Sequence, residues 1–264
     1  MTTNLNIKER SMEPRVLVLG LGEVGKPLMD VLRGSYGVAG KDVEPLEVNN
    51  VDVLHICYPF QIAEFISITV KYIKHYKPDL VVVNSTVTPG TTRKISEKAH
   101  MPVAYSPIRG KHVRMKEELL HYTKFVGGTD TSVTARAHDH FKKAGFKVRS
   151  LSSCEALELA KIMETTYFGL LVAWAQEIER FCGDTKSDYN EVMSFVEEVK
   201  YLPPVVFKPG YIGGHCVMPN IRLMEQLRES DFLKAIKASN ETKAREWISQ
   251  GRPLDERMAP TPRG

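Results

Sequence analysis

The amino-acid sequence predicts an α/β fold, in which a Rossmann-type, doubly wound parallel sheet is followed by an all-helical domain. Three observations predict it. An apolar strand, a glycine turn and a helical pattern follow one another from residue 15 to residue 32. Short apolar strands then alternate with helices through residue 149. From residue 152 the pattern changes to long helices, which indicates a second domain.

The composition is that of a globular protein. Hydrophobic residues make up 42% and charged residues 26% of the 264 residues, which excludes a disordered, collagen-like or coiled-coil chain. The net charge is +4 and the basic residues are scattered, so we expect no nucleic-acid partner. No apolar run reaches the roughly 18 residues of a membrane span, and the polar N-terminus is unlike a signal peptide. We therefore expect a cytoplasmic protein with no membrane partner.

The four cysteines are widely spaced, and no CxxC pair is present. They are expected to be thiols rather than disulfides or ligands of a structural zinc ion. The histidines show no metal-ligand spacing. In particular, His138 and His140 point apart on a helix, so we expect no metal site and interpret the histidines as solvated or core residues.

The first domain, residues 15–150, is expected to bind NAD. It begins with a buried strand at residues 15–20 and a helix from residue 26. Further strands are expected at residues 37–42, 51–57, 80–83, 103–105, 125–126 and 146–148. A helix at residues 61–76 is expected to bury Ile62, Phe65, Ile66, Val70 and Ile73, and another helix is expected at residues 131–144.

The second domain, residues 151–250, is expected to be helical and to serve dimerisation and substrate binding. Its long helix begins with Ser153 as the cap and Glu155 in the first turn, and runs to Cys182. Further helices are expected at residues 187–200, 218–229 and 231–249. Residues 1–14 are expected to be a flexible leader and residues 251–264 a disordered tail.

The glycine turn indicates a dinucleotide site. Gly20 permits the tight turn, Gly22 lets a pyrophosphate approach the backbone, and Gly25 lets the helix pack on the strand. Asp42 ends the next strand, 17 positions beyond Gly25, where a carboxylate can bind the ribose and disfavours a 2′-phosphate. The turn therefore predicts NAD as the cofactor. The alternative is a glycine turn in an unrelated α/β protein, with Asp42 as a loop acid.

A second candidate site is the glycine-rich loop at residues 209–214, which leads to His215 and Cys216. A helix is expected to begin just after Cys216, and a helix N-terminus favours the reactive thiolate. The alternative, a structural cysteine beside a turn, stays open from the spacing alone.

Three segments together resemble the UDP-glucose/GDP-mannose dehydrogenase family. They are residues 20–25, residues 84–90 (NSTVTPG) and residues 213–216 (GGHC). Supporting stretches are residues 125–128 (FVGG), 158–161 (ELAK) and 176–177 (QE). The resemblance covers about residues 14–245, and it identifies the chain as a short form without the C-terminal domain that binds the nucleotide sugar in this family.

The resemblance implies NAD-dependent oxidation of a sugar-nucleotide alcohol through a thiohemiacetal and a thioester. It makes Cys216 the nucleophile, Lys161 the cation beside the oxyanion, and Thr86 a residue near the nicotinamide and the catalytic water. As residues alone, Lys161 could equally be a solvated helix lysine, and Thr86 could close a turn before Pro89. The expected cofactor-binding residues are Gly20, Gly22, Glu23, Val24, Gly25, Asp42, Tyr58, Pro59, Ser85 and Thr86.

Three positions depart from the family pattern. Ile108 stands in place of a glutamate that is associated with thioester hydrolysis, Thr165 in place of an asparagine, and Asn220 in place of an aspartate in the catalytic set. Asparagine cannot act as a general base, so we expect impaired hydrolysis. The segment between residues 42 and 51 is also short, so the sheet is expected to lack an element.

The expected partners are a small-molecule substrate, a nucleotide sugar by resemblance, and a second copy of the chain. The resemblance places a homodimer interface on the helix at residues 153–182. Two alternatives remain open: a non-catalytic NAD-binding regulatory or scaffold protein, and an enzyme for another small alcohol or acid.

Overall fold

The computed structural model describes residues 15–43, 48–110, 114–198, 207–214 and 216–254. The chain divides into two compact units, Met1–Ala160 and Lys161–Gly264. The boundary falls inside the long helix, so the first turns of that helix belong to the first unit. The expected leader and residues 255–264 of the expected tail lie outside the described residues, as does His215.

The first unit contains a seven-stranded sheet in the order β2-β1-β3-β4-β5-β6-β7. The strands are β1 (Val16–Leu19), β2 (Val38–Lys41), β3 (Val53–Ile56), β4 (Leu80–Val83), β5 (Ala104–Tyr105), β6 (Lys124–Gly128) and β7 (Val148–Ser150). The strands β1 to β5 are parallel, as the sequence predicts. This confirms the Rossmann-type fold class.

The sheet departs from parallel pairing at β6. This strand runs antiparallel to β5, and β7 is parallel to β6. Between β5 and β6 the described residues, 106–110 and 114–123, include the seven-residue helix α4 (Met115–His121). The chain re-enters the sheet at the end where β5 leaves it, instead of making the long crossover that a parallel neighbour requires.

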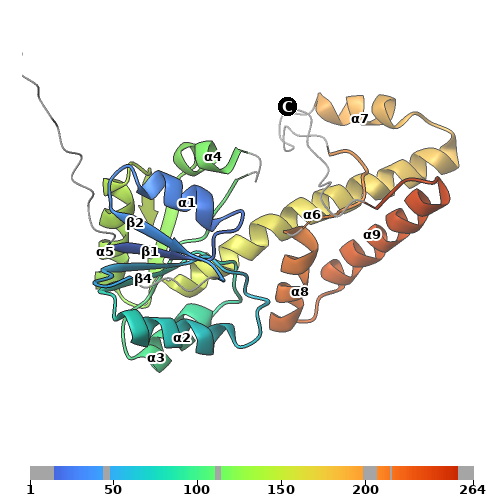
Figure 1. The fold of residues 1–264 in the computed structure, drawn as a ribbon. Coiled ribbons are helices and arrows are strands. Elements are labelled where there is room, and N and C mark those ends of the chain that lie inside the picture. Colours follow the sequence, from blue (N-terminus) through green and yellow to red (C-terminus); the bar gives the residue numbers. More distant parts are fainter. Residues whose placement is uncertain (1–14, 44–47, 111–113, 199–206, 215, 255–264) are drawn as a thin grey trace, which may run out of the picture. The chain divides into compact units, whose positions relative to one another are not determined.

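Helices cover both faces of this sheet (Figure 1). Helix α1 (Gly25–Leu32), α4 and α5 (Thr131–Lys143) lie on one face, and α2 (Phe65–Tyr76) and α3 (Thr91–Ala99) on the other. Helices α3 and α4 have no clear periodic pattern in the sequence and were not predicted, because each is short and buries few large apolar side chains. The expectation for Ile62 is wrong. Its side chain is 42% exposed because α2 begins only at Phe65.

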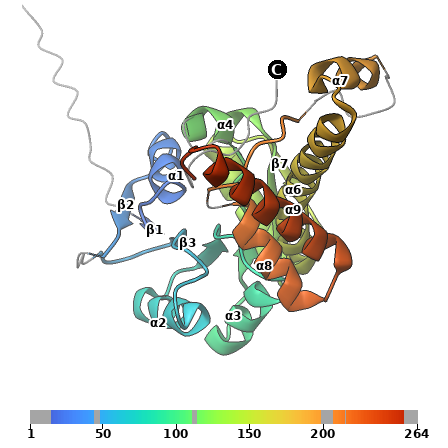
Figure 2. The ribbon, with the colours of Figure 1, turned by 90° about the vertical axis from the view of Figure 1, so that its right-hand side faces the viewer.

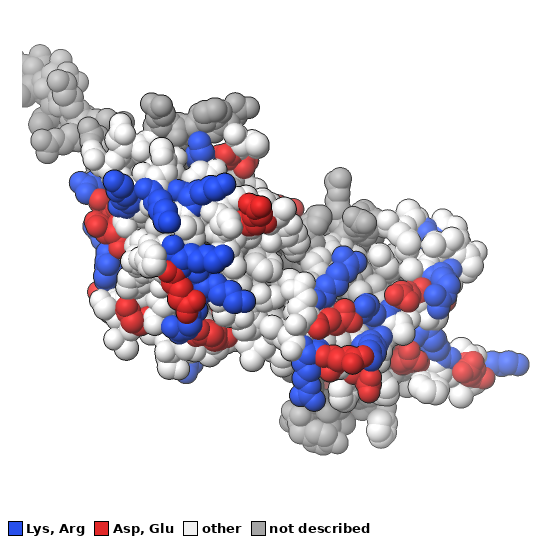
Figure 3. All heavy atoms as spheres, turned by 90° about the horizontal axis from the view of Figure 1, so that it is seen from below, with Lys and Arg blue, Asp and Glu red and all other residues white. Residues whose placement is uncertain are grey.

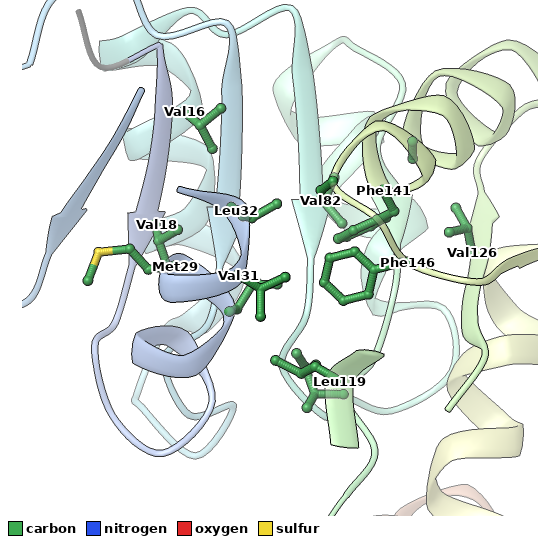
Figure 4. Close-up of a cluster of buried hydrophobic side chains, with 14 of the residues drawn as sticks. Val16, Val18, Met29, Val31, Leu32, Val82, Leu119, Val126, Phe141 and Phe146 are labelled. Atoms are coloured by element: carbon green, nitrogen blue, oxygen red, sulfur yellow. The ribbon is translucent and has the colours of Figure 1, made fainter. Parts of the chain in front are cut away.

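Each face of the sheet has its own apolar core, because side chains alternate along a strand. Val16 and Val18 of β1 pack on the α1 side, in the cluster shown in Figure 4, whereas Leu17 and Leu19 pack on the α2 side. Phe141 of α5 is fully buried in the first cluster. The two cores hold the strand ends in place, and the loops that follow those ends carry the candidate site.

The strand order reverses direction beside β1, with β2 on one side and β3 on the other. Ligands of open α/β sheets bind at such a switch point. The structure shows no helix between Lys41 and Val53 in the residues that it describes, and β2 is the edge strand. Whether the short segment after Asp42 costs the sheet an element relative to the family stays a prediction, because residues 44–47 lie outside the described residues.

The helices of the second part of the chain are α6 (Cys154–Thr185), α7 (Tyr189–Glu197), α8 (Val217–Leu227) and α9 (Asp231–Ser249). Ser153 caps α6, since its hydroxyl accepts the Ala156 N–H at 3.1 Å. Within the second unit, α6, α8 and α9 enclose an apolar cluster that includes Val172, Ile221 and Ile236 (Figure 2). Across the described residues, no helix combines the length and the apolar character that crossing a membrane needs.

Charges of both signs are interspersed on the face shown in Figure 3. Within the first unit, Arg93 pairs with Glu155, and within the second, Lys237 pairs with Glu225 at 3.0 Å. Surface pairs of this kind add little to stability, so the apolar clusters carry most of it.

Three buried polar side chains of the first unit, Asn84, His55 and His140, contact one another in a row. Fully buried His55 lies 3.0 Å from His140 between their Nε2 atoms, and its Nδ1 lies 3.1 Å from Nδ2 of Asn84. An amide nitrogen only donates, so His55 accepts at Nδ1 and donates its own proton to His140. Burial lowers the pKa of His140 to about 4 and that of His55 well below 6.5, and the cations of Lys143 and Lys124 add to this. The native state therefore keeps both rings neutral.

This pair predicts a loss of stability in mild acid. The unfolded chain binds a proton on each histidine near pH 6.5, whereas the native pair does not, so the free energy of unfolding falls as the pH drops below 6.5. We expect a loss of about 2 kcal/mol from His140 alone between pH 7 and pH 5, measured by urea unfolding. The double variant His55→Leu/His140→Phe should flatten this slope, whereas His138→Asn on the same helix should not. An unchanged slope in the double variant contradicts the assignment.

Candidate cofactor and nucleophile sites

The glycine turn between β1 and α1 is held by close backbone packing. Gly20 has a φ of +86°, and a Cβ there would lie 2.6 Å from the Tyr58 nitrogen. A Cβ at Gly25 would lie 1.8 Å from the Gly20 oxygen. Beside Gly22, in contrast, no atom lies within 4 Å of an added Cβ. Two glycines are thus required by packing, and the third leaves open space next to the backbone.

The start of α1 follows this turn. Val24 is its N-cap, and no side chain caps the helix there. The first N–H groups of a helix and its positive dipole end suit a phosphate group. Glu23 is exposed beside them. The turn and the helix start together form a surface that can hold a dinucleotide pyrophosphate.

Asp42 lies at the neighbouring strand end. The Gly20 N–H donates to the carbonyl of Lys41 at 2.8 Å, which ties the end of β2 to the turn. Asp42 comes next in the chain and is exposed. Its carboxylate is free of the core and can accept hydrogen bonds from ribose hydroxyls.

The loops after β3 and β4 are tied to each other. The Ser85 hydroxyl donates to the Tyr58 carbonyl at 2.6 Å. Tyr58 is buried, its hydroxyl pairs with that of Thr69 at 2.6 Å, and burial raises the pKa of its phenol. Pro59 is exposed and Thr86 is partly buried. The structure thus brings Gly20, Tyr58 and Ser85 together at the carboxyl ends of three strands.

Glu158 holds the loop that contains Thr86. This carboxylate is fully buried in the first turns of α6, and it accepts the Gly90 N–H at 2.6 Å and the Thr92 N–H at 2.8 Å. It thereby caps α3 from a distant part of the chain, and burial raises its pKa. The role of Glu158 was not predicted from the sequence, because no local pattern marks a helix cap that is supplied from 68 residues away.

Cys216 is the N-cap residue of α8 in the second unit, and its side chain is exposed. The first turn of α8 packs tightly on α6, because a Cβ at Gly169 would lie 2.6 Å from Val217 Cγ1. Lys161 belongs to the same unit. Its side chain is 12% exposed, and its ammonium lies 3.7 Å from the Glu164 carboxylate. The thiol thus sits at the positive end of a helix whose start is fixed by packing.

The two residues that depart from the family pattern in this unit pair with each other. The Asn220 amide donates to the Thr165 hydroxyl at 2.7 Å, and that hydroxyl donates to the Ile162 carbonyl at 3.1 Å. Asn220 is buried. The position is therefore neutral, and the amide group directs a donor, not a basic oxygen, at its partner.

The third departure lies in the first unit. Ile108 is buried in the apolar core, in the cluster that includes Met115 and Leu119. The next residue, Arg109, lies 5.0 Å above the Phe125 ring and donates to the Thr123 carbonyl at 3.0 Å. An apolar core contact replaces the carboxylate that the family pattern has at this position. The described residues also contain no group of His, Cys, Asp and Glu side chains suited to a metal ion.

Comparison with known proteins agrees with this geometry. Residues 155–242 match the model of the UDP-glucose/GDP-mannose dehydrogenase family, central domain. The matched segment is 88 of the 264 residues. Lys161, Thr165, Cys216 and Asn220 all lie within it, and the resemblance seen in the sequence extends to individual relatives.

One such relative is a UDP-N-acetyl-D-mannosamine dehydrogenase of Methanococcus maripaludis, 23% identical over 86% of this chain and 65% of the relative. Protein CapL of Staphylococcus aureus is 28% identical over 78% of this chain and 61% of its own. The chain thus spans under two thirds of the length of these relatives.

Solved structures share the fold. A UDP-D-ManNAc dehydrogenase of Pyrococcus horikoshii superposes with a TM-score of 0.79 at 18% identity, covering 89% of this chain and 70% of the other. A 3-hydroxyisobutyrate dehydrogenase of Mycobacterium tuberculosis superposes with a TM-score of 0.68 at 15% identity, covering 90% of this chain and 94% of the other. At these identities the likeness establishes the fold alone.

Proposed function

We propose that this protein is an NAD-dependent oxidoreductase that acts on a CH–OH group, with a nucleotide sugar as substrate. The observation that carries the proposal is the match of residues 155–242 to the dehydrogenase central domain. The glycine turn of the first unit supports it, because open space beside Gly22 and a helix start that no side chain caps suit a pyrophosphate.

Three residues of the chain are proposed to act in the oxidation: Cys216, Lys161 and Thr86. NAD, when bound, would accept two hydrides in turn, one from the alcohol carbon and a second, by another NAD, from the thiohemiacetal carbon, and each oxidation would release a hydroxyl proton to solvent. Cys216 is proposed to attack the aldehyde carbon as a thiolate, which forms a C–S bond, breaks the carbonyl π bond and places the negative charge on the former carbonyl oxygen. Lys161 is a cation that stabilises this charge. Thr86 is proposed to position the substrate oxygen or the water beside the nicotinamide.

The hydrolysis that releases an acid product is the step for which Ile108 and Asn220 supply no base. Hydrolysis of a thioester needs a base to take a proton from the attacking water. Asn220 is neutral and donates to Thr165, and Ile108 is apolar and buried. We therefore propose that the protein releases an aldehyde or hydrolyses its thioester slowly.

Calorimetry with NAD tests the cofactor site. Wild-type protein should bind NAD, and Gly22→Ala should weaken binding at least about tenfold, because a methyl group occupies the space that a phosphate needs. The same variant should keep the wild-type melting temperature, since nothing lies within 4 Å of the added Cβ. Equal NAD binding by the two proteins, or none by either, contradicts the site.

Product analysis tests the chemistry, with NADH absorbance followed on a panel of UDP- and GDP-sugars. Asn220→Asp should raise the ratio of acid to aldehyde product. The carboxylate can accept a hydrogen bond from the Thr165 hydroxyl and can serve as the base that takes a proton from the attacking water. Cys216→Ser should abolish acid formation in both backgrounds. Full acid formation by Cys216→Ser rules out the covalent route. Binding of NAD without turnover supports instead a non-catalytic NAD-binding regulator or scaffold.

A small hydroxy acid is the second candidate substrate. The observation that favours it is the superposition on 3-hydroxyisobutyrate dehydrogenase, which covers 94% of that chain and so leaves little of it unmatched. A two-unit chain of this length is therefore enough for that fold. NADH production from a 3-hydroxy acid, with none from nucleotide sugars, would identify a small hydroxy acid as the substrate.

We also propose that the chain forms a homodimer through α6. Large apolar side chains stay exposed along this helix in the second unit: Met163, Tyr167, Leu170, Trp174 and Phe181. Their spacing of three, four or seven places them along one side of the helix. Sedimentation should give twice the mass of 29.8 kDa, and Trp174→Glu, which introduces a charge at a side chain 59% exposed, should give monomers. A monomeric wild-type protein contradicts the dimer.

A further inference from the structure

The loop before Cys216 has no regular structure of its own in its described part, residues 207–214. Its backbone groups must therefore find partners elsewhere, because a buried N–H or C=O without a partner is costly. Ile212 is fully buried within this loop. Asn240 of α9 satisfies both of its backbone groups. The Asn240 amide accepts the Ile212 N–H at 2.7 Å and donates to the Ile212 carbonyl at 3.1 Å.

A second amide holds the same loop two residues earlier. Gln176 of α6 is fully buried and donates to the Gly210 carbonyl at 2.7 Å. Its oxygen accepts the Ser239 hydroxyl at 2.9 Å. Asn240 of α9 and Gln176 of α6 thus both hydrogen-bond to the backbone of the loop. We call this pair of side chains the amide clamp.

The direction of every hydrogen bond in the clamp is fixed. A guanidinium only donates, and Arg180 donates to the Ser239 hydroxyl at 3.1 Å. That hydroxyl then donates onward to Gln176, whose nitrogen is left to donate to Gly210. Arg180 is itself held by Glu246 at 2.8 Å. Because the Gly210 carbonyl only accepts, the Gln176 amide must present its nitrogen to the loop and its oxygen to Ser239.

The clamp lies close to the thiol along the chain. Cys216 follows Ile212 by four positions and begins α8, whose first turn packs on Gly169. One end of the segment is thus fixed by the amides and the other by helix packing. We infer that Asn240, supported by Gln176, is a positioning residue that sets where the Cys216 thiol stands, acting through the backbone of Ile212. The inference rests on the proposed function for its catalytic consequence only.

Spin labelling of Cys216 tests the placement without substrate or cofactor. Cys154 and Cys182 are buried, and burial raises the pKa of the partly exposed Cys57 thiol to about 12, so the label should go to the exposed Cys216. Peptide mass analysis checks this. Asn240→Ala should make the label more mobile under native conditions. Gln176→Met removes the hydrogen bond to the Gly210 carbonyl, together with that from Ser239, and keeps the side-chain length. It should raise the label mobility to a smaller extent, and it serves if Asn240→Ala does not fold. Thr242→Ala is the matched control on α9, because its hydroxyl donates only within the helix, to the Ala238 carbonyl.

Kinetics of the unlabelled proteins completes the test. Misplacement of a reacting group by about 1 Å can cost roughly 100-fold, so kcat for NADH formation should fall by that order in Asn240→Ala, with NAD affinity unchanged. A label as immobile in both clamp variants as in wild type overturns the inference, and so does a mobile label with full kcat. If the label becomes mobile but wild-type protein oxidises nothing in the panel, the placement stands and the proposed function fails.

Discussion

The buried loops of this protein depend on one constraint, which is that their backbone N–H and C=O groups need partners where water is excluded. In the first unit, the Glu158 carboxylate satisfies two N–H groups at the start of α3. In the second unit, the amides of Asn240 and Gln176 satisfy the loop that leads to Cys216. In both cases a buried polar side chain from a helix replaces the strand or water that would otherwise pair with the loop. The two candidate sites are built on these loops.

The chemistry of the two partners differs for a physical reason. Glu158 receives only donors, at the positive end of a helix, so a carboxylate suits it. Ile212 presents one donor and one acceptor, so only an amide such as that of Asn240 matches both. The same reasoning explains His55, which must accept from Asn84 and donate to His140 and can do so only as the neutral ring.

In the second unit, Cys216 presents a thiol at the start of α8 and Lys161 is a cation on α6, while the buried Asn220 is neutral. Asn220 and Thr165 satisfy each other, and Ile108 lies in the apolar core of the first unit. A substitution at one of these positions alone would leave a polar group without its partner. The mutual pairing of Asn220 and Thr165 avoids that cost and produces a well-packed site without a base.

The sequence by itself determined what depends on local pattern. Four apolar residues before Gly20 specify β1, the glycine spacing specifies the turn, and the unbroken run after Ser153 specifies α6, because strand and helix periodicities are properties of neighbouring residues. It also identified Cys216 as the residue before a helix. The start of α2 was wrong at Ile62, since burial depends on where the chain turns and not on spacing alone.

Only the tertiary structure decided which distant groups meet. Four such contacts join residues between 19 and 85 positions apart. They are the Ser106–Phe125 bond beside the reversed strand β6, the cap that Glu158 gives to α3, the pairing of His55 with His140, and the hydrogen bonds of Asn240 to Ile212. Contacts of this kind leave no periodic signal in the sequence. They form because burial removes water from polar groups, and only the folded chain shows which partner is near enough to replace it.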